Sequence, residues 1–138
     1  ESFRQVFADI YGGAKYTVVE AEKQDDGSYV VTITYEQMNV FEPAMTAYMD
    51  EVNSMVEEWT AAISAGGEMP SDEEMSEQII SKYKDCFVDA LANVTYDEPA
   101  TATLRIELVD NVWTPNEDDV INLETVFFDM EDALNAIQ

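Results

Sequence analysis

The chain has 138 residues, of which 46% are hydrophobic and 11% aromatic, enough for one globular domain with a single core. Thirty acidic residues against six basic ones give a net charge of −24, and such a surface repels nucleic-acid phosphates and anionic membranes. Composition therefore argues against nucleic-acid binding, and no apolar run reaches the roughly 18 residues that a membrane span needs.

The first predicted element is an amphipathic helix over residues 2–11. Its apolar residues recur every three or four positions, as one face of a helix requires: Phe3, Val6, Phe7 and Ile10. Gly12 and Gly13 follow, and we expect them to end the helix in the left-handed conformation that glycine adopts without strain.

Two strands are predicted next, over residues 15–22 and 29–36. The second alternates apolar and polar positions, with one face made of Tyr29, Val31, Ile33 and Tyr35. An Asp-Gly turn at residues 26–27 joins the strands, so we expect an antiparallel hairpin. The alternation shifts after Glu36, which predicts a bulge or bend there.

A pair of long helices is predicted in the middle of the chain. The first runs from Pro43 to about Ser64 and carries a broad apolar stripe of Met45, Tyr48, Met49, Val52, Met55, Val56, Trp59 and Ile63. A polar connection at residues 66–70 precedes the second helix, which spans residues 72–93 and opens with a Ser71–Glu74 capping box. The short connection predicts an antiparallel helical hairpin.

The segment 100–115 is the central β-hairpin. Its first strand places Ala102, Leu104, Ile106 and Leu108 on one face and polar residues on the other, so one side should face the core. Asp110 and Asn111 tolerate positive φ and suit a two-residue turn, after which a short return strand ends at Pro115.

Asn116 can cap a last helix, in which apolar residues recur at three-to-four spacing up to Ile137. The whole order is helix, hairpin, helix pair, hairpin, helix (α-ββ-αα-ββ-α). We predict a single α+β domain over residues 1–138, with a four-stranded antiparallel sheet whose apolar face is covered by the helices.

The amino-acid composition gives little support for a catalytic or metal-binding site. The chain has no histidine, so neither a Ser–His nor a Cys–His pair can form, and its one cysteine, Cys86, is expected to be a small buried residue. The acidic clusters lack the spacing of an EF-hand calcium loop. We predict no catalytic residues, no metal ligands and no cofactor.

Aromatic residues offer the remaining candidate site. Tyr35, Tyr48, Trp59 and Trp113 come from the predicted sheet and helices, and could line a ligand pocket between them. The alternative is that these side chains fill the core.

The order of motifs resembles a family of small uncharacterised lipoprotein ectodomains of Gram-positive gut bacteria. The resemblance rests on the run YTVVEAEKQDDGSYVVTITYEQM, the helix pair, and the run TATLRIELVDNVWTPNEDDVINL, in which Asn111 stands where the family usually has glycine. It implies a cystatin-like fold of the nuclear-transport-factor type. It also implies an exported domain, truncated here at its N-terminus, that a lipidated N-terminal cysteine tethers to the membrane.

Three functional hypotheses follow. The first is a non-enzymatic, extracytoplasmic binding or interaction module of unknown partner. The second is a small-molecule-binding or enzymatic cystatin-like domain that uses the aromatic pocket, and the third is a domain that responds to divalent cations. A homodimer through a sheet edge or an apolar helix face is also considered, although the net charge opposes it.

Overall fold

A computed structural model describes residues 2–137 and shows an α+β chain with a four-stranded antiparallel sheet. The elements in chain order are α1 (Phe3–Gly12), β1 (Lys15–Lys23), β2 (Tyr29–Glu36), β3 (Met38–Asn39), α2 (Phe41–Ser64), α3 (Asp72–Ala92), β4 (Thr95–Tyr96), β5 (Ala100–Val109), β6 (Val112–Pro115), α4 (Glu117–Phe127) and α5 (Met130–Ala136). Both the sheet and the order of elements agree with the prediction.

The sheet has the strand order β1-β2-β5-β6, and its register fixes which residues share a face. Val31 of β2 lies opposite Ala21 of β1 and Leu104 of β5. Directly opposed residues point to the same side of an antiparallel sheet, so these three mark its apolar face. Leu104 and Ile106 are half-buried on this face, as the alternation in β5 predicts.

Several local predictions are confirmed. Asp110 and Asn111 have φ values of 51° and 62°, so the central hairpin closes with both turn residues in the left-handed region. Ser71 and Glu74 form the capping box of α3, and hydrogen bonds from the Ser71 backbone N–H and hydroxyl lower the pKa of the Glu74 carboxyl. The Asn116 side chain accepts a hydrogen bond from the Asp119 N–H at the start of α4.

The bend predicted after Glu36 is also present, and it separates two sheets. β2 ends at Glu36, and β3 pairs instead with β4 in a small two-stranded sheet. A further irregularity, which the sequence pattern did not indicate, lies in β1 between Val18 and Glu20.

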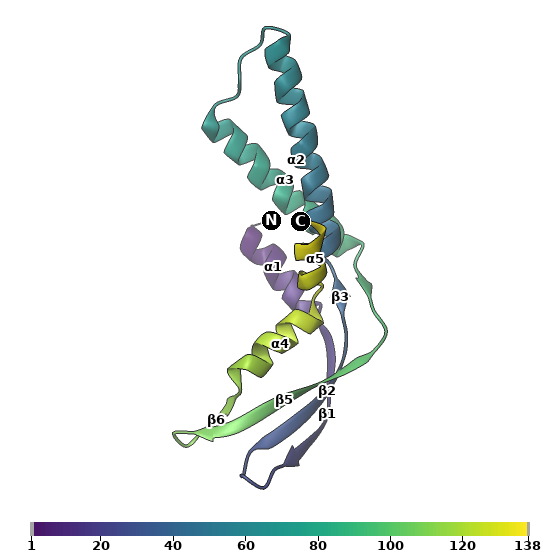
Figure 1. Cartoon of the computed structure of the whole chain (residues 1–138), viewed down its shortest axis with the longest axis vertical. Coiled ribbons are helices and arrows are strands. Elements are labelled where there is room, and N and C mark those ends of the chain that lie inside the picture. The colour runs from purple at the N-terminus through teal and green to yellow at the C-terminus, as the bar shows by residue number, and fades with distance from the viewer. Residues whose placement is uncertain (1, 138) are drawn as a thin grey trace.

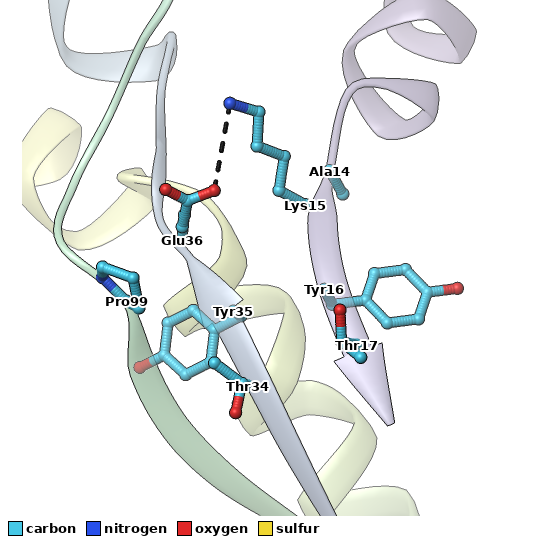
Figure 2. Close-up of a pocket in the computed structure, with 8 residues that line it drawn as sticks. All are labelled: Ala14, Lys15, Tyr16, Thr17, Thr34, Tyr35, Glu36 and Pro99. Atoms are coloured by element: carbon cyan, nitrogen blue, oxygen red, sulfur yellow. Dashed lines mark ion pairs between the residues drawn. The ribbon is translucent and has the colours of Figure 1, made fainter. Parts of the chain in front are cut away.

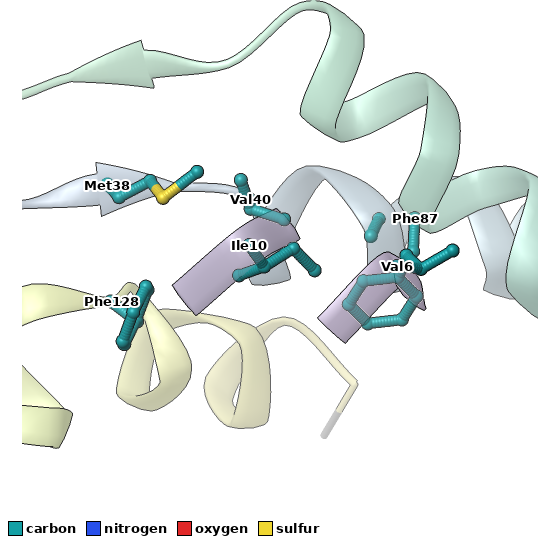
Figure 3. Packing of buried hydrophobic residues seen from close by; sticks show 7 residues of the cluster. Val6, Ile10, Met38, Val40, Phe87 and Phe128 are labelled. Carbon is teal, nitrogen blue, oxygen red and sulfur yellow. The ribbon is translucent and has the colours of Figure 1, made fainter. Parts of the chain in front are cut away.

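The main core lies beyond the end of the large sheet, where α1, β3, α2 and α3 meet (Figure 3). Its fully buried members are Val6, Ile10, Met38, Val40, Ala44, Phe87 and Phe128. The large sheet itself contributes only two buried hydrophobic side chains among the described residues, Val31 and Ile33. The molecule is accordingly elongated, with the sheet at one end and the α2–α3 hairpin projecting from the other (Figure 1).

This arrangement corrects the prediction that the helices cover the sheet. α4 packs against β5, whereas α2 and α3 pack on each other and extend away from the strands (Figure 1). The expected left-handed end of α1 is also wrong. Gly12 belongs to the helix, and Gly13 has a right-handed φ of −83° with its N–H bonded to Asp9 and Ile10 carbonyls.

The predicted last helix is broken into α4 and α5 at Phe128 and Asp129. Phe128 is extended and forms an isolated parallel bridge with Met38. Asp129 is 1% exposed and accepts three backbone hydrogen bonds at the start of α2. The donors are the N–H groups of Val40 at 2.9 Å, Phe41 at 2.7 Å and Glu42 at 2.8 Å. Asp129 thus caps a helix far away in sequence, which a continuous last helix could not do.

Candidate functional site

The first group of exposed apolar side chains lies on the large sheet, at the two ends of its apolar face. Tyr16 and Val18 of β1 pair with Tyr35 and Ile33, and so lie on the apolar face. Leu108 pairs with Trp113 on the same face at the other end of the sheet. We call these four exposed residues, Tyr16, Val18, Leu108 and Trp113, the sheet surface.

The sheet surface is exposed because α4 covers only part of the apolar face. Phe127, at the end of α4, lies over the face, with its ring 5.4 Å from that of Tyr16 and 5.3 Å from that of Tyr35. At the opposite end, Leu108 and Trp113 remain 54% and 51% exposed. Groups of exposed apolar side chains, such as the one at each end of this face, are typical of interaction surfaces.

A second exposed apolar surface lies on α2. Met49, Val56 and Ile63 are 38%, 49% and 46% exposed, and they recur at seven-residue intervals. Seven residues are two helical turns, so the three side chains follow one side of the helix. We call these three residues the α2 stripe.

The sequence pattern does not separate the α2 stripe from the rest of the broad apolar side of this helix. The width of the apolar pattern could have indicated that some of its residues are exposed, since Tyr48 and Met55 extend the pattern well around the helix. One neighbouring helix cannot cover so broad a stripe. Met55 is indeed buried, whereas Val56 is not.

The four aromatic residues predicted to line a pocket have different neighbours. Tyr35 packs against Phe127, Tyr48 makes an edge-on contact with Tyr83 at 5.1 Å, and Trp113 makes one with Tyr29 at 5.4 Å. Trp59 is half-buried in the outer part of α2. The structure therefore places two of them on the sheet and two on α2, and ligand binding by them stays a prediction.

Three of the hollows along the large sheet are partly open to solvent. The one drawn in Figure 2 has a volume of about 380 Å³ and lies at the start of β1, where Thr17 and Thr34 line it. The Lys15 ammonium is 3.9 Å from the Glu36 carboxylate and 3.7 Å from the centre of the Tyr96 ring. Its charge is thus already balanced by side chains of the chain itself.

The shifted titratable groups between α2 and α3 have structural explanations. The hydrogen bond and charge of Glu51, whose carboxylate is 2.8 Å from the Lys82 ammonium, raise the pKa of Lys82. Burial raises the pKa of the Cys86 thiol, which keeps the sulfur protonated and poorly nucleophilic. Burial, followed by the charge of Tyr48, also raises the pKa of Tyr83.

Within residues 2–137, no group of three or more acidic or cysteine side chains is arranged to hold a metal ion. Over the same residues, no helix combines the length and apolarity needed to cross a membrane.

Comparison with known proteins adds no relative. No protein-family model, curated protein or solved structure matches this chain. The two exposed apolar surfaces are therefore the features from which a function can be argued.

Proposed function

We propose that this chain is a non-enzymatic interaction module that binds a partner through exposed apolar side chains. The observation that supports this best is the set of large hydrophobic side chains that are exposed to solvent, seven of which make up the sheet surface and the α2 stripe. Burying roughly 100 Å² of such side chains removes about 2.5 kcal/mol of unfavourable hydration, so a partner can gain substantially from covering them.

The residue types support a binding role over a catalytic one. The chain has no histidine to move protons near neutral pH, and its one thiol is buried with a raised pKa. The wider proposal places this module outside the cytoplasm, anchored through an N-terminal lipid and related to cystatin-like domains. It rests on the family resemblance, and metabolic labelling of the full-length protein with a lipid analogue tests the anchor.

A position-dependent cross-link tests the interaction. A photoreactive phenylalanine analogue is placed at Leu108, at Val56 or, as a control, at Glu20 on the polar side of β1, and the cells that make the protein are irradiated. We expect one adduct of defined mass from Leu108 or Val56 and none from Glu20. Absence of an adduct from both apolar positions, or equal adducts from all three, would contradict the proposal.

A further inference from the structure

The α2 stripe lies on a part of the molecule with an unusual charge. Residues 41–81 comprise α2, the connecting loop and the first half of α3, and they include no lysine or arginine. Their acidic residues are Glu42, Asp50, Glu51, Glu57, Glu58, Glu68, Asp72, Glu73, Glu74 and Glu77. Lys82, the next residue after this range, pairs with Glu51, but the other charges of α2 and the loop are all acidic, so a segment that covers the α2 stripe enters a negative field.

The α2 stripe is separate from the side of α2 that packs on α3. Glu51 marks the α3 side, because it pairs with Lys82, and Met55 lies one turn further along the same side. Met55 is buried, whereas its neighbour Val56, rotated by about 100° around the helix, is half exposed. The α2–α3 packing thus leaves the α2 stripe open.

The geometry of the α2 stripe suits a helical partner. From Met49 to Ile63 the stripe is about 21 Å long at the helical rise of 1.5 Å per residue. Seven-residue spacing is the repeat with which two helices interlock their side chains. Asp50 and Glu57 follow Met49 and Val56 by one residue, so each carboxylate lies about 100° around the helix from its stripe residue, on one flank of the stripe.

Charge complementarity selects the chemistry of the partner. A second copy would bring the same acidic residues and a net charge of −24, and an anionic lipid surface would be repelled as well. A helix with an apolar face bordered by lysine or arginine would be attracted and also bury the α2 stripe. Methionine adapts its shape to different partners, and Met49 on α2 and Met69 in the adjoining loop are both exposed.

We propose that the α2 stripe docks a cationic amphipathic helix of a partner protein, an inference that rests on the proposed interaction function. Apolar residues of the partner lie along Met49, Val56 and Ile63, and its basic residues lie near Asp50 and Glu57. In this arrangement the partner helix follows α2, which belongs to the hairpin that projects away from the sheet (Figure 1).

Synthetic peptides test this with the whole chain in 0.15 M NaCl. The probe is a 21-residue helix with leucine at the heptad core positions and lysine on its flanks. The comparisons are a scrambled peptide of the same composition and a peptide with glutamate in place of lysine. Calorimetry should detect the lysine helix, with the scrambled and glutamate peptides at least tenfold weaker. If the scrambled peptide bound with equal affinity, the proposal would be overturned, because the net charge of the peptide alone would then explain the binding.

Two matched variants of the chain show where the lysine peptide binds. Val56→Asp should weaken the lysine helix at least tenfold, whereas Val112→Asp, at a position 62% exposed in β6, should leave its affinity unchanged. Circular dichroism and the melting temperature confirm that both variants fold. Equal affinities of Val56→Asp and the unaltered chain would place the helix elsewhere and overturn the inference.

A negative result of the peptide experiment can be distinguished from a negative result of the cross-linking experiment. If the lysine helix does not bind but Val56 still cross-links in cells, the chain is an interaction module whose partner is not a cationic helix. If neither Val56 nor Leu108 cross-links, the proposed function itself fails.

Discussion

Asp129 shows how one buried carboxylate can join distant parts of this chain. Its two oxygens accept hydrogen bonds from three consecutive N–H groups at the start of α2, while Asp129 itself directly precedes α5. The N-terminus of a helix has unpaired N–H groups and a partial positive charge, and both favour a carboxylate there. Val40, the residue that precedes α2, has no side chain capable of this.

Replacing Asp129 tests the importance of this cap. Asp129→Ala should lower the free energy of unfolding by about 2–4 kcal/mol, because it leaves buried donors without acceptors. Urea denaturation measures the change, and Asp132→Ala, at an exposed position in the neighbouring helix α5, is the control. A loss below about 0.5 kcal/mol would show that water or a neighbouring group replaces the carboxylate.

At the scale of elements, the end of α1 is fixed by packing on β3. A Cβ atom at Gly13 would lie 2.8 Å from the Cε of Met38, a fully buried member of the core. At Gly12 a Cβ would meet nothing within 4 Å. The two adjacent glycines therefore have different roles, one in close contact with the core and one inside the helix.

Alanine at each glycine distinguishes these roles. Gly12→Ala should raise the free energy of unfolding by about 0.5–1 kcal/mol through the better helix propensity of alanine. Gly13→Ala should lower it by about 1–3 kcal/mol, since Met38 must move within a packed core. Thermal or urea unfolding of the two variants compares them directly. Destabilisation of similar size in both would favour the left-handed helix end that the sequence alone suggested.

The elements differ in how far sequence could predict them. The strands, the Asp110–Asn111 turn and the Ser71 cap follow from local patterns, because alternation, turn residues and caps act over a few positions. The break at Phe128 could not be predicted in this way. Three-to-four spacing continues through it, and the competing contacts to Met38 and the start of α2 are about ninety residues away.

The candidate surfaces show the same limit. Sequence patterns identified which side chains of α2 and the sheet are apolar, but only tertiary structure decides which apolar residues are covered. Trp113 alternates correctly with its neighbours and yet is half exposed, because α4 covers the other end of the face. The α2 stripe is exposed because it lies away from the side of α2 that packs on α3.

At the scale of the whole molecule, charge repulsion is the main electrostatic effect on stability. The net charge is −24, while the described residues contain three ion pairs, all between half-exposed side chains. Exposed pairs of this kind contribute about 0–1 kcal/mol each. The elongated shape separates some of the acidic groups, but those on α2 and the start of α3 remain close together along one hairpin.

Salt should therefore stabilise the fold. Raising NaCl from 0.01 to 0.15 M shortens the screening length from about 30 to 8 Å, which weakens repulsion between carboxylates more than it weakens three short exposed pairs. We expect the melting temperature to rise by roughly 3–6 °C, corresponding to about 1 kcal/mol or more for a chain of this size. Adding 1 mM CaCl₂ at 0.15 M NaCl is the control, and it should change the melting temperature little if screening alone acts. A melting temperature that falls with NaCl would mean that the ion pairs outweigh the repulsion, and a large further rise with calcium would indicate an ion bound to the folded chain.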